Sequence, residues 1–149
     1  MCLDFDILSI FNGVNDVGFG MRHGTGASAK KFGRIYDELI EETLERKPGI
    51  DLVLCQPFVM PVDHDWPPYG NDIFQNYAAW REAIAERGEI VRELANKYGA
   101  LFVPLREVME KALERAPAAH WSVDAIHPSH AGHELIARTW LSVAGHLIK

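Results

Sequence analysis

Cysteine and positive charge are both scarce in this sequence. Its 149 residues include two cysteines, Cys2 and Cys55, whose positions fit neither a disulfide framework nor the spacing of metal ligands. Lys and Arg together number 15 against 21 Asp and Glu, which gives a formal net charge of -6 at pH 7. Because phosphate groups are bound by clustered cationic side chains, we expect no nucleic acid and no anionic membrane among the main partners.

Long apolar runs are absent as well. No stretch approaches the roughly 20 apolar residues of a transmembrane helix, and the first residues lack the charged flank and apolar core of a secretion signal. With so few cysteines, this favours a cytoplasmic location, and a signal peptide would have to lie upstream of Met1. The 48% of hydrophobic residues predict one globular domain over residues 1–149.

Strand-like and helix-like patterns alternate along the chain. Strands are predicted at residues 3–11, 51–55 and 100–105, and helices at residues 28–46, 71–98, 106–115 and 129–148. The glycine-rich stretch 13–26 is predicted to be a loop, and Gly88 is a possible interruption of the second helix. This alternation predicts an α/β fold, with a parallel sheet that has helices on both faces.

Two polar motifs follow predicted elements. Asp124 and His127 are separated by two residues, just before Pro128, so a tight loop can set the carboxylate against the imidazole. A carboxylate bonded to Nδ1 fixes the tautomer and leaves Nε2 free to accept a proton from a nucleophile. The second motif, Gly13 to Asp16, lies at the carboxyl end of the first strand, where parallel sheets bind ligands.

These motifs resemble those of the SGNH (GDSL-type) hydrolases. ILSIFNGVND resembles the block whose asparagine donates to the oxyanion, and WSVDAIHPSHAGHELIA resembles the block with the acid and base of a Ser-His-Asp triad. The segments LCQPFVMP and VRELANKYGALFVPL extend the likeness over nearly the whole chain. The resemblance implies a three-layer α/β/α sandwich around a five-stranded parallel sheet, and cleavage of small acyl esters without a cofactor. It also implies catalytic roles for Asp124, His127 and Asn15, with Gly13 beside Asn15 at the oxyanion.

The sequence departs from this family at its beginning. The Gly-Asp-Ser block with the nucleophile, and the oxyanion glycine, precede the Gly-x-Asn-Asp strand in the family, whereas that strand starts here within the first few residues. None of the serines at positions 9, 28, 122, 129 and 142 has a Gly-Asp-Ser setting. We therefore expect a truncated domain without its N-terminal strands and nucleophile. Because each lost oxyanion donor costs ~10²–10³ in rate, we expect slight or no ester turnover by this chain alone.

Loss of those strands is expected to leave Asp6 to Phe11 as an open strand edge. Such an edge is a template for pairing, so we expect self-association into a homo-oligomer. A non-catalytic remnant that acts as an oligomeric binding or structural module is the alternative function. A third reading is a metal-dependent hydrolase using His127, His130 and His133, but no carboxylate or cysteine pattern supports the string, and we expect no metal.

Several aromatic residues are candidates for a pocket or for the core. Trp66 and Tyr69 lie in a proline-rich stretch that is predicted to be a packed loop beside a pocket, where they either line an acyl or sugar site or only pack. Trp80 and Trp140 have helical spacing and are predicted in the core. The sequence leaves the substrate open among lipids, acetylated sugars, thioesters and arylesters.

Overall fold

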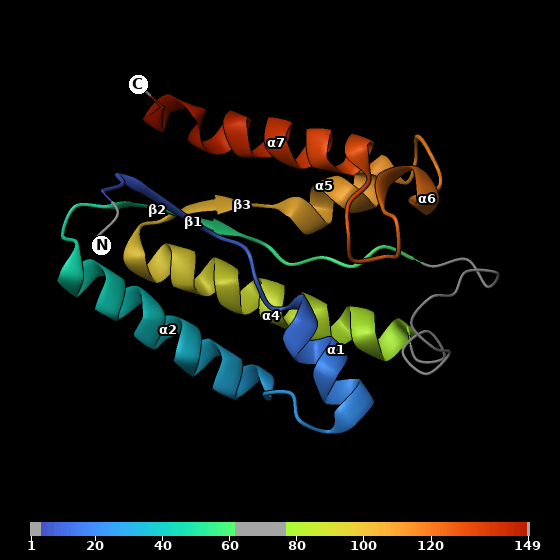
Figure 1. The fold of residues 1–149 in the computed structure, drawn as a ribbon, viewed down its shortest axis with the longest axis horizontal. Coiled ribbons are helices and arrows are strands. Elements are labelled where there is room, and N and C mark those ends of the chain that lie inside the picture. The colour runs from blue at the N-terminus through green and yellow to red at the C-terminus, as the bar shows by residue number, and fades with distance from the viewer. Residues whose placement is uncertain (1–3, 62–76, 149) are drawn as a thin grey trace.

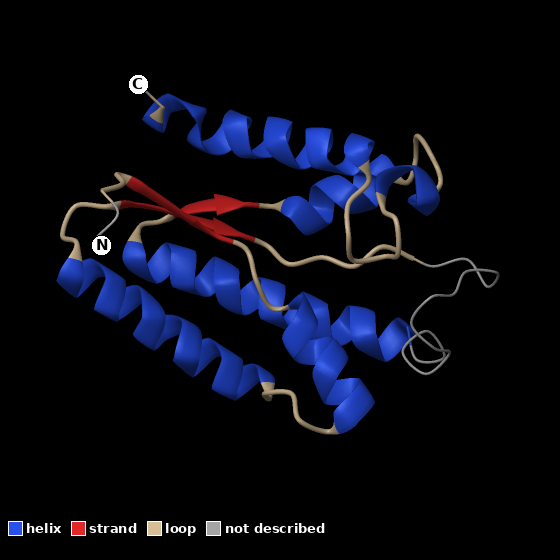
Figure 2. Ribbon diagram, in the orientation of Figure 1, coloured by secondary structure: helices blue, strands red, loops and turns tan. Residues whose placement is uncertain are grey.

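A computed structural model describes residues 4–61 and 77–148 of the chain. Three strands, β1 (Ile7–Ile10), β2 (Asp51–Cys55) and β3 (Leu101–Val103), form a parallel sheet in the order β1-β2-β3 (Figure 2). Ile7 lies opposite Asp51, and Val53 opposite Leu101. β2 has the predicted bounds, whereas β1 and β3 are shorter than predicted.

Helices cover both faces of the sheet. They are α1 (Val14–His23), α2 (Ala29–Arg46), α4 (Tyr77–Tyr98), α5 (Leu105–Ala112), α6 (Ala118–Trp121) and α7 (His130–Ala144), followed by a 3-10 turn (Gly145–Leu147). α2 and α4 lie on one side of the sheet and α5 and α7 on the other, as Figure 1 shows. The predicted α/β/α layering is therefore confirmed, and α6 is an element that the sequence did not predict.

Each face of the sheet has its own hydrophobic core. The core on the α2 and α4 side contains Phe32, Tyr36, Ile40, Leu52, Leu54, Val91 and Leu94, and the core on the α5 and α7 side contains Val53, Cys55, Val103, Leu105 and Met109. Because β2 is covered on both faces, its sequence is a continuous apolar run. Trp80 is fully buried, which confirms it as a core residue, whereas Trp140 is partly buried and packs against the edge of the second core.

Local signals explain several helix boundaries. α2 begins after Ser28, whose side chain accepts a hydrogen bond from the Lys31 N–H at 3.2 Å. α4 ends before Gly99, which has a φ of 64°. The predicted interruption of α4 at Gly88 is wrong. A Cβ at Gly88 would lie 3.1 Å from Gln56 Cγ, so the glycine there allows the helix to approach the segment after β2. The predicted start of this helix at residue 71 or 72 lies outside the described residues.

The predicted loop over residues 13–26 is also wrong, because Val14–His23 form α1. Its three internal residues of low propensity, Gly18, Gly20 and the β-branched Val17, made a helix a poor prediction. Tertiary contacts outweigh this local preference: Val17 is buried at 4% exposure, and the Asp16 carboxylate is paired with Arg87 of α4.

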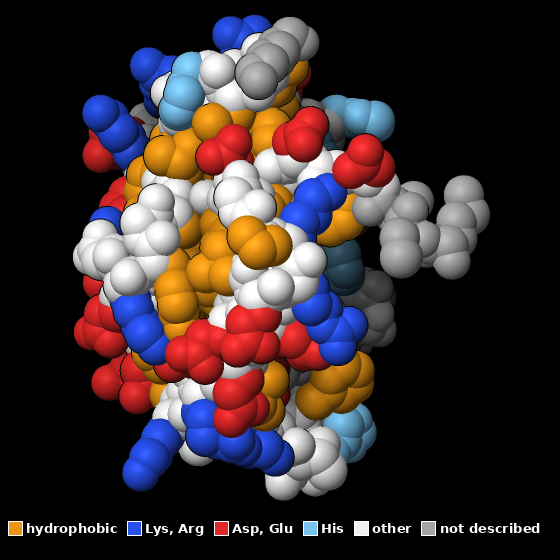
Figure 3. Space-filling model, turned by 90° about the vertical axis from the view of Figure 1, so that its left-hand side faces the viewer, with side chains coloured by type: hydrophobic (Ala, Val, Ile, Leu, Met, Phe, Trp, Pro, Cys, Tyr) orange, Lys and Arg blue, Asp and Glu red, His pale blue; other side chains and the backbone are white. Residues whose placement is uncertain are grey.

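The surface carries charges of both signs. On the face shown in Figure 3, Lys and Arg side chains are interspersed with Asp and Glu around a band of hydrophobic side chains, and they form no single basic patch there. Among the described helices, none is both long and apolar enough to cross a membrane.

β1 lies at one edge of the sheet that the described residues form. Two phenylalanines flank the strand and are largely exposed, Phe5 at 39% and Phe11 at 46%. Among the described residues no strand pairs with this edge, and self-association through it stays a prediction.

Candidate active site

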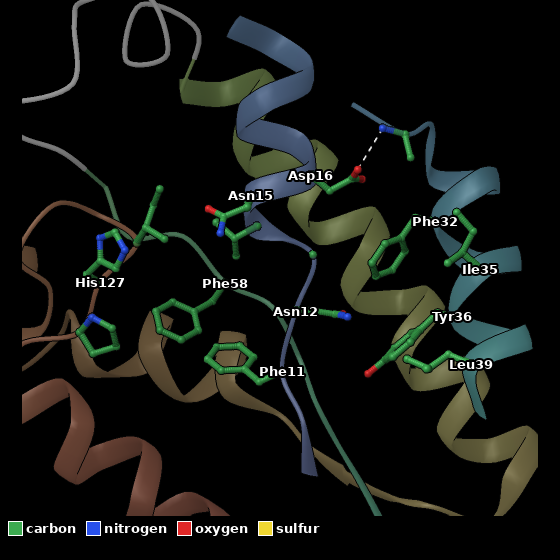
Figure 4. A pocket seen from close by; sticks show the side chains of 15 residues that line it. Phe11, Asn12, Asn15, Asp16, Phe32, Ile35, Tyr36, Leu39, Phe58 and His127 are labelled. Atoms are coloured by element: carbon green, nitrogen blue, oxygen red, sulfur yellow. Dashed lines mark hydrogen bonds between the residues drawn. The ribbon is translucent and has the colours of Figure 1, made fainter. Parts of the chain in front are cut away.

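A cavity of about 530 Å³ lies at the carboxyl ends of β1 and β2. Residues from four separate parts of the chain line it, including Phe11, Asn15, Phe32, Tyr36, Phe58 and His127. Figure 4 shows His127 and Asn15 toward one end of the cavity and Tyr36 and Leu39 toward the other. The lining is therefore polar at one end and mainly aromatic and aliphatic elsewhere.

Asp124 and His127 form a hydrogen-bonded pair at the polar end. His127 Nδ1 lies 2.6 Å from Asp124 Oδ2. The other carboxylate oxygen, Oδ1, accepts the backbone N–H groups of Ile126 at 3.1 Å and of His127 at 2.7 Å. The Asp124 side chain is 6% exposed and that of His127 is 66% exposed. The buried carboxylate thus fixes the imidazole through Nδ1, and Nε2 is left for a reacting group.

The environment of Asp124 keeps it ionised. Burial alone would raise the pKa of its carboxyl group, since it penalises the charged form. The hydrogen bonds from the backbone and side chain of His127 and from the Ile126 backbone oppose this effect and outweigh it, so the pKa lies below its usual value. An ionised Asp124 is the form that stabilises a protonated imidazole.

A short, closed loop holds this pair. The Val123 N–H and the Ser122 hydroxyl both donate to the His127 carbonyl, at 2.7 and 3.0 Å. Between the two partners, Ala125 has a φ of 73°, a left-handed conformation that is uncommon for a residue with a Cβ. Its carbonyl accepts the Met60 N–H at 2.9 Å, which ties the loop to the segment after β2.

Asn15 approaches the same cavity from the first turn of α1. Gly13, with a φ of 113°, precedes this helix and makes the turn out of β1 that a side chain would strain. The N-terminus of a helix offers unpaired backbone N–H groups and a partial positive charge, which favour an anion. The exposed Asn15 amide and this helix end together present donors beside His127.

No serine lines the cavity. All the serines of the sequence lie within the described residues, and the hydroxyl group of each makes a hydrogen bond outside the cavity. Ser9 accepts from the Trp140 indole N–H, Ser28 caps α2, and Ser129 caps α7. Ser122 and Ser142 donate to the carbonyls of His127 and Thr139. None of these serines therefore places its hydroxyl group against the His127 imidazole.

His130 and His133, the other histidines of the predicted string, do not line the cavity. Trp66 and Tyr69 lie outside the described residues. In the part of the chain that the structure describes, no group of three or more His, Cys, Asp or Glu side chains is arranged to hold a metal ion, and this includes His130 and His133.

Sequence reasoning missed two residues that line the cavity and one that pairs with Asp16 behind it. Phe58 lies just beyond β2, and Tyr36 lies on α2, where the apolar periodicity made it a core residue only. Burial first, and then the nearby Cys55, raise the pKa of the Tyr36 hydroxyl, which has no hydrogen-bond partner among the described residues. Arg87 was also missed. Its position three residues after Ile84 and four before Val91, on the buried face of α4, signals a charge that needs a buried partner.

Comparison with known proteins finds similar sequences and structures among esterases and lipases. An acetylxylan esterase of Geobacillus stearothermophilus is 27% identical over 146 residues, which cover 94% of this chain and 59% of that protein. A solved GDSL-like lipase from Parabacteroides merdae is 29% identical with a TM-score of 0.80, over 94% of this chain and 60% of that one. An α/β hydrolase from the metagenome of Lake Arreo shares the fold, with a TM-score of 0.75 at 23% identity over 97% of this chain and 62% of that one.

The chain spans about three fifths of the length of these relatives. Its residues 3–135 match the family model described as the GDSL-like lipase/acylhydrolase family. The match covers most of the chain and includes both the segment with Asn15 and the loop with Asp124 and His127. The chain therefore belongs to the GDSL-like lipase/acylhydrolase family.

Proposed function

We propose that this chain contributes the general base and an oxyanion donor of a carboxylic ester hydrolase. The observation that supports this best is the buried Asp124 carboxylate 2.6 Å from His127 Nδ1, with the imidazole at the same end of the cavity as Asn15. The arrangement matches the geometric roles of a hydrolytic triad without its nucleophile.

The chemistry follows from these positions. His127 Nε2 accepts the proton of an attacking hydroxyl group as its oxygen bonds to the ester carbonyl carbon. Asp124 stabilises the imidazolium, and the Asn15 amide, beside Gly13, donates to the oxygen that becomes negative. When the tetrahedral intermediate collapses, the alkoxide leaves and receives the proton from His127, which returns to its neutral form. In this scheme, the chain's own residues hold and move the proton.

The rate of ester hydrolysis depends on which hydroxyl group attacks the ester. Because none of the serines lines the cavity, His127 in this chain alone is limited to activating water. We therefore propose slight or no turnover by residues 1–149 alone, and full turnover when further polypeptide supplies a serine near Nε2.

Short acyl esters are the proposed substrates. The similarity to acetylxylan esterases supports acetyl esters. Phe11, Phe58 and Ile126 line the cavity together with His127 and offer apolar contacts to an acyl group. Acetylated sugars are thus the first natural class to examine.

Hydrolysis of p-nitrophenyl acetate tests the proposal. Residues 1–149 are compared with a version extended upstream through a Gly-Asp-Ser segment, each with and without His127→Ala. His133→Ala, an exposed histidine on α7, is the matched control. We expect activity in the extended version that is lost in His127→Ala and kept in His133→Ala. Equal activity with and without His127 would contradict the proposed base.

A non-catalytic module is the second candidate. The open edge of β1 and the absence of a serine from the cavity favour it. In that case both versions are silent toward acetyl esters, while the short chain stays folded and oligomeric.

A further inference from the structure

Arg87 is a buried cation on the apolar face of α4. The residue is 4% exposed, and its guanidinium makes four hydrogen bonds. Nε and Nη2 both donate to Asp16 Oδ2, at 3.3 and 3.1 Å. The remaining bonds are from Nη1 to the Ala83 carbonyl at 3.0 Å and from Nη2 to the Ala27 carbonyl at 2.6 Å. Three of these bonds thus reach α1 and the segment that follows it, and the fourth stays within α4.

Asp16 joins the same two segments from the other side. Its Oδ1 accepts the Ala27 N–H at 2.9 Å, as Figure 4 shows, while Oδ2 is paired with Arg87. Ala27 therefore donates its N–H to Asp16 and accepts from Arg87 through its carbonyl. These bonds form a closed ring of three residues, which we call the Asp16 clamp: Asp16, Ala27 and Arg87.

Close backbone packing completes the clamp. A Cβ on Gly26 would lie 2.3 Å from the Asp16 carbonyl oxygen and 2.4 Å from Gly20 Cα, so only glycine permits the approach. The segment after α1 folds back against the helix at this point. The first turn of α1 is consequently held by α4 and by its own following segment.

We propose that Arg87 is a positioning residue for Asn15. Asn15 immediately precedes Asp16 in the chain, and both residues line the cavity. The N-cap residue of α1 is a glycine, so no side chain caps this helix. The clamp thus holds the turn from which Asn15 reaches the oxyanion position. The inference rests on the proposed function for the role of Asn15, while the clamp itself is testable without turnover.

If position 87 served only to pack the core, an apolar residue would be sufficient there. The neighbours on this face of α4, Ile84 and Val91, show that an aliphatic side chain fits the stripe. A guanidinium there requires a fixed acceptor set, because a buried charge needs its partners. Its forked shape matches the carboxylate and two carbonyls that surround it, and a lysine ammonium lacks that fork.

The first experiment measures position directly by NMR. In Arg87→Met we expect shifted or broadened Asn15 side-chain amide signals and about tenfold faster hydrogen exchange of the Ala27 N–H, as for the loss of a hydrogen bond. Arg87→Lys should give an intermediate result, because it keeps the charge and loses the fork. Arg92→Met is the matched control on the same helix, where the arginine pairs with the exposed Glu89 and Glu107.

A second variant reaches the clamp without touching Arg87. Gly26→Ala forces the segment away from Asp16, and we expect the same change in the Asn15 signals. If Arg87→Met fails to fold, this variant tests whether the clamp holds Asn15. Folded Arg87→Met or Gly26→Ala proteins with wild-type Asn15 and Ala27 signals would overturn the inference.

Steady-state kinetics distinguish a positioning role of Arg87 from a merely structural one. In the extended, ester-hydrolysing version, we expect Arg87→Lys to lower kcat about tenfold with KM unchanged, since an oxyanion donor acts in the transition state. A raised KM with unchanged kcat would overturn the role. If the extended wild type does not hydrolyse esters at all, the proposed function fails, and the NMR comparison still decides whether Arg87 holds Asn15.

Discussion

Ala125 is the one non-glycine residue with a positive φ in the part of the chain that the structure describes, and it lies between the two partners of the Asp124 and His127 pair. A left-handed conformation outside glycine costs of order 1–3 kcal/mol. The Met60 N–H and the two bonds to the His127 carbonyl hold the loop in this form. The strain is therefore located where the carboxylate must meet the imidazole.

Substitution of Ala125 tests this account. Ala125→Val places a β-branched side chain at a positive φ in a buried site, and we expect a loss of about 1–3 kcal/mol in the free energy of unfolding. Ala125→Gly should stay within about 1 kcal/mol of the wild type, because relief of strain opposes the loss of a buried methyl group. Urea unfolding measures both. Equal stability of the valine and glycine variants would contradict the strain.

Asp124 gives the stability of the fold a dependence on pH. Its folded pKa lies below the ordinary value because its hydrogen bonds outweigh burial, so its stabilisation is complete above the unfolded pKa of about 4 and is lost as pH falls through the folded pKa. We expect Asp124→Asn to be less stable than the wild type at pH 6, and this difference to shrink at pH 3. Urea unfolding at the two pH values is the measurement, and a constant difference would speak against the linkage.

At the scale of elements, α7 depends on its N-cap. Ser129 accepts the Gly132 N–H at 3.2 Å and donates to the His120 carbonyl at 2.5 Å, so it anchors the helix that follows the His127 loop. Ser129→Ala should cost about 1–2 kcal/mol in thermal or urea unfolding. Ser28→Ala on α2 is the comparison and should cost less, since the Ser28 side chain makes only the capping bond with the residues that the structure describes. The opposite order would indicate that the bond to His120 adds no stability.

Elements with local sequence signals could be predicted, and elements that depend on distant contacts could not. β2 and α2 could be predicted because their signals lie inside or next to them: a continuous apolar run, the Ser28 cap and Gly49. The Asp124 and His127 pair was equally local, since three positions separate the partners. α1 could not be predicted, because its glycines disfavour a helix and its stabilising partner, Arg87, lies 71 residues from Asp16. Contacts at such distances leave no periodic trace in a single sequence.

At the scale of the whole molecule, the open edge of β1 predicts association. Unpaired strand edges with exposed apolar flanks are templates for another strand, and Phe5 and Phe11 are such flanks. We expect a dimer or larger species by light scattering at micromolar concentration, and a shift toward monomer in Phe5→Lys. Leu141→Lys, which changes a leucine of 52% exposure on α7, is the control and should leave the mass unchanged. A monomeric wild type would refute the proposal.

The Asp16 clamp also has a consequence for the order of folding. A glycine-containing helix of 10 residues is below the length at which isolated helices persist in water, so α1 gains its stability only after α4 has docked. Closing a contact across 71 residues is slow compared with forming a local turn. α1, and with it the oxyanion side of the cavity, is thus expected to form late along the folding pathway, after the sheet and the α2 and α4 pair have assembled.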